Sequence, residues 1–188
     1  RKTICFAGGC FWGIEALTAA ARRDGGHRRY ANGDSPGHAN YGDVCTGLTG
    51  FREAVRVEYD DTAISSPICC SPSLPDRSGD ANRQGPDFGS QYQTGVYWTD
   101  PADEAVIRPI AALEAGAVPF FAVELKPSLL YPAETYHQRY LEKHPRGYCH
   151  VAPWKLAALP AYPFSTEDYV LPAKVLLDQR REAESQER

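Results

Sequence analysis

A strand-to-helix junction near the start of the chain constrains its fold more than any other sequence feature. Residues 3–7 (TICFA) have the length and apolar character of a buried strand, and Gly8-Gly9 ends that strand. From Cys10 or Phe11 to about Arg23, the sequence FWGIEALTAAARR places apolar side chains at helical spacing. The sequence therefore predicts a strand, a tight glycine turn and a helix, with a cysteine at the turn.

The rest of the chain mixes strands and helices irregularly. Further strands are predicted at residues 54–59, 93–98 and 120–125, and further helices at residues 101–115 and 133–143. The stretches predicted as irregular are the basic connection 24–29 (DGGHRR) with the loop YANGDSPGHANYGDV after it, most of 65–90, and a frayed charged end (REAESQER). The sequence shows no internal repeat and no second core, so we expect a single α+β domain built as a two-layer α/β sandwich.

Composition and charge exclude several classes of protein. The 188 residues are 43% hydrophobic and 23% charged, which is typical of a globular domain. The net charge of -4 argues against a nucleic-acid-binding surface, and no apolar run approaches the ~20 residues that span a bilayer. The N-terminal residues also lack the pattern of a secretory leader. We therefore expect a cytoplasmic monomer that binds neither nucleic acid nor membrane.

The cysteines are too few and too irregularly spaced for a disulfide scaffold. They lie at positions 5, 10, 45, 69, 70 and 149, and no C-x-x-C pair gives the spacing of zinc ligands. We therefore expect no metal site, and the question becomes which single thiols are reactive. Cys5 is expected to point inward from its strand and Cys45 to be structural, while the adjacent Cys69 and Cys70 receive no role.

Cys10 occupies a position that favours a reactive thiol. At a strand-to-helix turn, the first helical N–H groups and the positive end of the helix dipole favour an anion. This environment is expected to lower the pKa of Cys10 and to make it a nucleophile near neutral pH. Phe11 and Trp12 would form an aromatic wall beside it. The same residues also suit a small buried cysteine packed against core aromatics, and the spacing alone leaves both interpretations open.

Four polar residues are candidate partners of this cysteine. Glu53 opens a predicted strand, whereas Tyr41, Asp87 and Tyr92 lie in Gly-rich, loop-like sequence. Loops carry functional residues more often than core residues. Tyrosine hydroxyls and a carboxylic acid could together hold and protonate a substrate oxygen. Taken singly, each of the four is better explained as a surface or turn residue.

A second candidate thiol, Cys149, lies in the loop-like stretch RGYCH before a Pro-rich tail. A mobile thiol there could reach a distant reactive cysteine, although an ordinary loop cysteine beside His150 fits the same sequence. Two other chemistries are not supported. The glycines around Cys10 lack the Lys-Ser/Thr pair of a phosphate-binding loop, and none of the histidines has the context of a hydrolase base.

Seven motifs in a fixed order identify a family resemblance. They are GCFWG (9–13), YANG (30–33), Tyr41 through VCTG (41–47), TGxxEAV (49–55), NRQGxDxGxQY (82–92), PAExxHQ (132–138) and GYCH (147–150). From about Thr3 to His150, in this order and spacing, the chain resembles the peptide methionine-S-sulfoxide reductase (MsrA) family. The first motif is specific by itself, and the ordered set makes a chance match very unlikely.

The resemblance implies a mixed sheet in a two-layer α/β fold, with a ferredoxin-like core and a surface active site. It implies a catalytic domain over residues 1–150 and a Pro-rich, charged tail over 151–188 that packs on the domain or trails it. It also implies thiol-dependent repair of oxidised proteins, peptides or free methionine sulfoxide, with thioredoxin as the external reductant. No metal or organic cofactor would take part.

The resemblance further assigns roles to single residues. Cys10 would attack the sulfoxide sulfur and become a sulfenic acid, Glu53 would donate a proton to the sulfoxide oxygen, and Cys149 would form a disulfide with Cys10. Glu53 would need a raised pKa to be protonated at neutral pH. The substrate-binding residues would be Phe11 and Trp12 around the methyl group, and Tyr41, Tyr92 and Asp87 on the polar side.

The chain departs from the family pattern at residues 65–80, where Pro67, Pro72 and Pro75 exclude the usual helix. This departure supports a second interpretation, a non-catalytic module that keeps the pocket and binds oxidised or methylated side chains. A third interpretation is a hydrolase that would form an acyl adduct at Cys10. We favour the reductase because none of the departures removes a catalytic group.

Overall fold

A computed structural model of the chain describes residues 2–20, 27–59, 83–84, 87–117, 121–149, 167 and 169–187. Its strands are β1 (Lys2–Ala7), β2 (His27–Ala31), β3 (Arg52–Tyr59), β4 (Arg83–Gln84), β5 (Asp87–Phe88), β6 (Gly95–Trp98), β7 (Glu124–Pro127) and β8 (Leu130–Pro132). Its α-helices are α1 (Phe11–Ala20), α2 (Tyr41–Val44), α3 (Pro101–Ala115), α4 (Tyr140–Lys143) and α6 (Leu171–Gln186). Its 3-10 helices are η1 (Pro36–His38), η3 (Ser90–Tyr92) and η4 (Thr135–His137).

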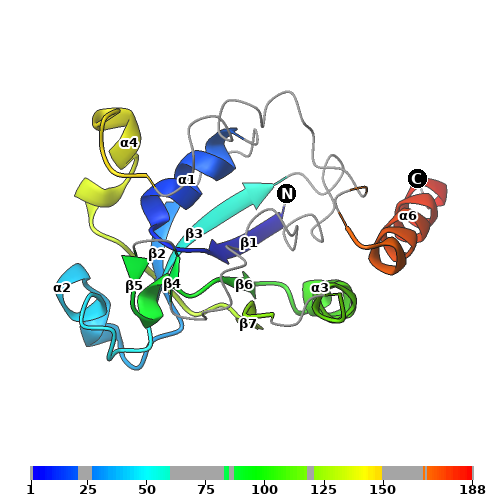
Figure 1. The fold of residues 1–188 in the computed structure, drawn as a ribbon, viewed down its shortest axis with the longest axis horizontal. Coiled ribbons are helices and arrows are strands. Elements are labelled where there is room, and N and C mark those ends of the chain that lie inside the picture. The colour runs from blue at the N-terminus through cyan, green and yellow to red at the C-terminus, as the bar shows by residue number, and fades with distance from the viewer. Residues whose placement is uncertain are drawn as a thin grey trace.

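Six of the strands form one mixed sheet in the order β7-β6-β1-β3-β2-β8. Neighbouring strands are antiparallel except for β6 and β7, which are parallel. β4 and β5 pair separately as a small antiparallel ribbon. Figure 1 shows α2 and α4 at one end of the molecule and α6 at the opposite end, beside α3. The mixed sheet and the single domain are therefore as predicted.

The central strand β1 is buried on both faces, because the two faces meet different parts of the core. Ile4 and Phe6 belong to the main apolar cluster, which includes residues of α1, β3 and α3. Cys5 and Ala7 belong to a second cluster with small side chains of β2 and β3. Cys5 is thus inward-facing, as its place in the strand predicted. A strand buried on both faces reads as a continuous apolar run, which explains the TICFA pattern.

Several predicted elements are confirmed, but four of the described strands were not predicted: β2, β4, β5 and β8. The predictions at 3–7, 54–59, 93–98 and 101–115 correspond to β1, β3, β6 and α3, and the strand predicted at 120–125 lies slightly later, at Glu124–Pro127. The prediction that residues from His27 onward form a connection and loop is wrong, because His27–Ala31 is β2. This strand carries two arginines and no β-branched residue, so its pattern gave no strand signal.

The single helix predicted over 133–143 is wrong. The chain forms η4 and the one-turn helix α4, separated by an extended Gln138 (ψ 128°) and a left-handed Arg139 (φ 53°). The Gln138 side chain bonds to both backbone polar groups of Arg28, and the Arg139 N–H donates to Glu15 at 3.0 Å. These long-range hydrogen bonds stabilise the non-helical conformation of Gln138 and Arg139. Tertiary contacts of this kind override local helix propensity.

The frayed end predicted for the charged C-terminus is also wrong, because helix α6 continues to Gln186. Its buried residues Ala173 and Leu177 pack with Tyr169 against Ile110 of α3. Of the charged residues predicted as frayed, Arg181, Glu182 and Glu187 are exposed. Within the part of the chain that the structure describes, no helix has the length and apolarity needed to cross a membrane. Most of the predicted loop at 65–90 lies outside the described residues; within them, β4 and β5 pair.

The packing of α6 gives a stability prediction. Leu177 is 2% exposed whereas its neighbour Leu176 is 39% exposed. Leu177→Ala is expected to lower the free energy of unfolding by about 2–4 kcal/mol, because it leaves a cavity between α6 and α3. The matched change Leu176→Ala is expected to cost less than about 1 kcal/mol. Chemical denaturation of both variants tests this, and equal losses would contradict the packing described.

Candidate active site

The predicted strand–turn–helix junction around Cys10 is present, and a hydrogen bond from a distant part of the chain holds its backbone. Gly9 adopts a left-handed conformation (φ 87°), and its N–H donates to the carbonyl of Tyr92 at 3.1 Å. A left-handed residue costs little here because glycine has no Cβ. The Cys10 carbonyl accepts from the N–H of Gly13 at 3.1 Å, and its thiol accepts from the N–H of Trp12. Cys10 therefore caps the N-terminus of α1.

Glu53 shares the same helix end. In the β1–β3 register Ala7 pairs with Ala54, so Glu53 lies just past the end of β1, beside the turn. The N–H of Phe11 donates to Glu53 Oε2 at 3.0 Å. The carboxyl group is only 2% exposed, and burial raises its pKa to about 8, an effect to which the charge of Asp87 adds. The raised pKa that the predicted acid needs is therefore present.

The pKa of Cys10, in contrast, is raised and not lowered as predicted. Burial shifts it to about 12, and the neighbouring charges of Glu53 and Asp87 add to the shift. The Trp12 N–H and the charge of Arg28 act in the opposite direction without overcoming it. The prediction considered only the effect of the helix N-terminus. Local sequence does not reveal that Cys10 is 8% exposed and lies near two carboxyl groups. At neutral pH the unliganded site holds a thiol beside a carboxylic acid.

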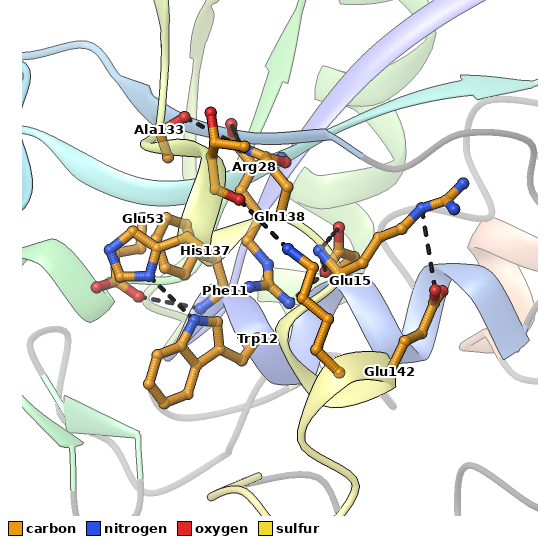
Figure 2. A network of polar contacts seen from close by, with 12 residues as sticks. Phe11, Trp12, Glu15, Arg28, Glu53, Ala133, His137, Gln138 and Glu142 are labelled. Carbon is orange, nitrogen blue, oxygen red and sulfur yellow. Dashed lines mark hydrogen bonds and ion pairs between the residues drawn. The ribbon is translucent and has the colours of Figure 1, made fainter.

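Phe11 and Trp12, the residues of the predicted aromatic wall, are both packed against neighbouring rings. Phe11 is buried, and Trp12 is partly buried and stacks on Tyr140 with ring centroids 3.7 Å apart. The Trp12 indole N–H donates to Nδ1 of His137 at 3.2 Å, as Figure 2 shows. The indole is therefore fixed by one stacked ring and one hydrogen bond, and its orientation beside Cys10 is set before a substrate arrives.

Sequence reasoning missed His137 as a member of the site. It is 1% exposed, and its ring contacts those of Phe11, Trp12 and Tyr41 at centroid distances of 5.0, 5.9 and 4.6 Å. Burial lowers its pKa to about 4, so the ring is neutral at neutral pH. The Trp12 N–H occupies Nδ1, which leaves the ring proton on Nε2, 3.8 Å from Glu134. The PAExxHQ motif contains His137 and was the available signal, but the sequence analysis gave this histidine no role.

Tyr41 is placed by Glu134, the second residue that sequence reasoning missed. The Glu134 carboxylate accepts from the Tyr41 N–H at 2.7 Å and from the hydroxyl of Tyr30 at 2.6 Å. The Tyr41 hydroxyl donates to the thiol of Cys45. Cys45, which the sequence suggested to be structural, is exposed. Its thiol lies close enough to Glu53 for that charge to raise the pKa of Cys45.

The other two predicted substrate-binding residues, Asp87 and Tyr92, lie close together in the chain. Tyr92 and Asp87 lie in η3 and β5, and Asp87 accepts a hydrogen bond from the Tyr148 hydroxyl at 2.9 Å. Burial and the charge of Glu53 raise the pKa of Tyr92, while burial and the bond to Asp87 raise that of Tyr148. The charges of both Cys10 and Cys149 act on the Tyr148 hydroxyl, so this side chain lies near both thiols.

The fold thus brings the predicted pocket residues close to Cys10. They surround Cys10 from α1, α2, β3, the β5–η3 segment and the stretch before Cys149, while Cys69, Cys70 and His150 lie outside the described residues. Within those residues, no group of three or more His, Cys, Asp or Glu side chains is arranged to hold a metal ion. The arrangement offers a thiol, a protonated carboxyl group, tyrosine hydroxyls and an aromatic wall.

Comparison with known proteins places this arrangement in one family. The family model described as peptide methionine sulfoxide reductase matches residues 2–159. The peptide methionine sulfoxide reductases MsrA of Clostridium perfringens (strain ATCC 13124) and Mycoplasma genitalium are 39% and 38% identical to the chain over 158 and 162 residues, covering 80% of it and 98% of each relative.

Two solved structures are similar in fold. Reduced Mxr1 of Saccharomyces cerevisiae has a TM-score of 0.68 and 33% identity, over 79% of this chain and 88% of that one. Methionine sulfoxide reductase A of Corynebacterium diphtheriae has a TM-score of 0.65 and 29% identity, over 79% of this chain and 77% of that one.

The raised pKa of Glu53 predicts a pH-dependent stability. Its ordinary value is 4.5, so between that pH and about pH 8 the folded chain holds a proton that the unfolded chain has lost. Raising the pH through this window therefore destabilises the folded state. The free energy of unfolding of the wild type, minus that of Glu53→Gln, is expected to fall by about 1 kcal/mol per pH unit. Urea denaturation of both proteins at several pH values measures this difference, and a difference independent of pH would contradict a buried, protonated Glu53.

Proposed function

The chain belongs to the peptide methionine sulfoxide reductase family and is an MsrA-type oxidoreductase, and from this membership we propose the roles of its residues. In our proposal Cys10 is the nucleophile, Glu53 is the acid and Cys149 is the resolving thiol. The observation that carries the proposal is that one helix end holds both reacting groups: the Trp12 N–H bonds the Cys10 thiol, and the Phe11 N–H bonds Glu53.

In the proposed first step, the Cys10 sulfur bonds to the sulfoxide sulfur while Glu53 gives its proton to the sulfoxide oxygen. The proton that Cys10 loses replaces the proton that Glu53 has given away. The protonated oxygen then passes to the Cys10 sulfur as the new sulfur–sulfur bond breaks. The products are methionine and a Cys10 sulfenic acid, so the substrate sulfur is reduced by two electrons and Cys10 is oxidised by two.

The pocket side chains would orient the sulfoxide for this step. The Trp12 indole, which is only partly buried, would receive the methyl group together with the adjoining Phe11 ring, which is buried in the core. The hydroxyls of Tyr41 and Tyr92 would donate to the sulfoxide oxygen, since their pKa values respond to the charges of Cys10 and Glu53 and they therefore lie close to both. Asp87 would complete the polar side.

In the proposed second step, the Cys149 thiol attacks the Cys10 sulfenic acid. A disulfide forms between the two sulfurs and one water leaves. An external dithiol, thioredoxin in our proposal, then reduces the disulfide and becomes a disulfide itself. The Tyr148 hydroxyl, influenced by both thiols and bonded to Asp87, supports a short path between Cys10 and Cys149. No metal or organic cofactor takes part in either step.

Coarser features of the protein extend the proposal. We infer a ferredoxin-like core, supported by the antiparallel strand order β6-β1-β3-β2. We infer that residues 1–150 form the catalytic domain and that the tail beyond them packs on it, as the contact of α6 with α3 supports. We further propose a cytoplasmic monomer that repairs oxidised proteins, peptides and free methionine sulfoxide without binding nucleic acid or membrane.

A thiol count tests the assignment of the two cysteines. The reduced protein is mixed with one equivalent of a methionine-S-sulfoxide peptide, without reductant, and methionine and remaining thiols are measured over time. The wild type is expected to lose two thiols for each methionine formed, mapped by mass spectrometry to Cys10 and Cys149. Cys149→Ser is expected to form the same product and retain a Cys10 sulfenic acid, and Cys10→Ser is expected to form none.

Other outcomes of this experiment separate the alternatives. A disulfide between Cys10 and a different cysteine would reject Cys149 as the resolving thiol and leave the reductase in place. Binding of the peptide with neither methionine nor thiol loss would indicate the non-catalytic module. Methionine formation at the wild-type rate by Cys10→Ser would reject the proposed nucleophile.

The pH dependence of the first step tests the role of Glu53. The pKa of about 8 predicts that the single-turnover rate at limiting sulfoxide falls about tenfold per pH unit above pH 8, where Glu53 loses its proton. Glu53→Gln is expected to lower the rate at neutral pH by about 100-fold and to abolish this dependence. Glu58→Gln, on the same strand and more exposed, is the matched control and is expected to behave as the wild type. A Glu53→Gln variant that retains the wild-type rate would rule out this acid.

A further inference from the structure

Arg28 is a charged side chain that the proposed reaction does not use, and it is completely buried beneath the active site. Its exposed fraction is 0%. Its N–H donates to Gln138 Oε1 at 2.8 Å, and its carbonyl accepts from Gln138 Nε2 at 3.0 Å and from the N–H of Ala133 at 3.1 Å. The backbone at Arg28 is therefore fixed on both sides, which fixes where its long side chain begins.

The guanidinium of Arg28 has an ionic partner but lacks hydrogen-bond acceptors for some of its N–H groups. Nη2 forms an ion pair with the buried carboxylate of Glu15 on α1. Among the described residues, Nε and Nη1 have no hydrogen-bond acceptor, although both are buried. Burying guanidinium N–H groups without acceptors is costly, and hydrophobic side chains of similar volume often serve a core better. Packing alone does not account for an arginine at this position.

The guanidinium lies over the ring of Phe11, the residue that follows Cys10 in the chain and hydrogen-bonds Glu53. Its Cζ is 5.5 Å from the centre of the Phe11 ring, and the backbone N–H of Phe11 holds Glu53. Figure 2 shows Arg28 between Glu15 and Phe11, with Glu53 bound to the same helix end. The positive charge favours the ionised forms of both Cys10 and Glu53, which gives it a direct influence on the two groups that exchange protons.

We propose that Arg28 is a positioning residue of the reductase step, holding a buried positive charge behind Phe11 that stabilises negative charge formed on Cys10 and on Glu53. This inference rests on the proposed function. When Glu53 gives its proton to the sulfoxide oxygen, the Glu53 carboxylate carries a negative charge. When the Cys10 proton then moves to Glu53, the negative charge moves to the attacking Cys10 sulfur. Arg28 exchanges no proton and forms no bond. In a buried site of low dielectric, a charge acts on its neighbours more strongly than it does in water.

Several other groups act on the same atoms, and their charges must be considered. Those that face Cys10 are Glu53, Asp87 and Arg28, together with the hydroxyls of Tyr41, Tyr92 and Tyr148. Those that face Arg28 are Glu15, Cys10, Glu53 and His137. His137 is neutral near pH 7 because its pKa is about 4, so it does not compete with Arg28 as a cation.

Two charge-changing variants test the proposal because they act in opposite directions. Arg28→Met removes the buried cation, and Glu15→Gln removes the anion that compensates it while keeping an oxygen for the Arg139 N–H. Alkylation of Cys10 by iodoacetamide is followed across a pH series and mapped to Cys10 by peptide mass spectrometry. Arg28→Met is expected to slow alkylation at a given pH by about tenfold, which corresponds to one pKa unit. Glu15→Gln is expected to accelerate it by several-fold, and Arg28→Lys, which keeps the charge, to restore most of the rate.

The same variants are compared in single turnovers with a methionine-S-sulfoxide peptide. Arg28→Met is expected to lower the maximal rate with little change in the sulfoxide concentration for half-maximal rate. If Arg28→Met does not fold, the sign of the change in Glu15→Gln decides. Slower alkylation in both variants, or no change in Glu15→Gln, would overturn the proposal and leave Arg28 a structural residue. A wild type that turns over no sulfoxide would refute the reductase roles separately, since the alkylation rates do not depend on turnover.

Discussion

The N-terminus of α1 is the constraint on which the rest of the active site depends. A helix leaves its first N–H groups without partners, and here two of them bond to the Cys10 thiol and the Glu53 carboxyl group. The bonds require that β1 ends at Ala7 and that β3 is in register, so that Glu53, which precedes Ala54 on β3, lies just past the end of β1. A shift of one residue in this register would turn Glu53 to the other face of the sheet.

The second layer of the site is organised around His137 and Glu134. His137 lies among the rings of Phe11, Trp12 and Tyr41 and accepts the indole N–H, while Glu134 holds the backbone of Tyr41. Both residues follow β8, which is hydrogen-bonded to β2 at the edge of the sheet. The segment that breaks the predicted helix is thus the one that supports the aromatic wall. A continuous helix there would lose the bonds from Gln138 and Arg139 that anchor it to Arg28 and Glu15.

The sequence predicted the parts of the structure that are specified locally. Apolar runs predicted β1 and β6, helical spacing predicted α1, and a proline at the first turn predicted α3. The ordered motifs supplied every proposed reacting residue. It did not predict β2, because a strand containing Arg28 and Arg29 shows no alternating pattern until Glu15 and the neighbouring strands are in place. It also gave the wrong direction for the pKa of Cys10, since helix capping is local but burial and the approach of Glu53 depend on strands far apart in the chain.

The raised pKa values of Cys10 and Glu53 belong together and give the resting site a consistent chemical state. With pKa values of about 12 and about 8, both groups are protonated at neutral pH, so the buried site holds no thiolate. Cysteine is oxidised and alkylated mainly as the thiolate, so a neutral Cys10 reacts slowly with oxidants and alkylating agents when no substrate is bound. In the proposed reaction the thiolate appears only when Glu53 has a sulfoxide oxygen to which it can pass a proton. The negative charge then moves between two groups that share a helix end and lie in front of the same buried arginine. Such a site can keep its nucleophile inactive without a separate switch, because the substrate itself accepts the proton whose departure activates it.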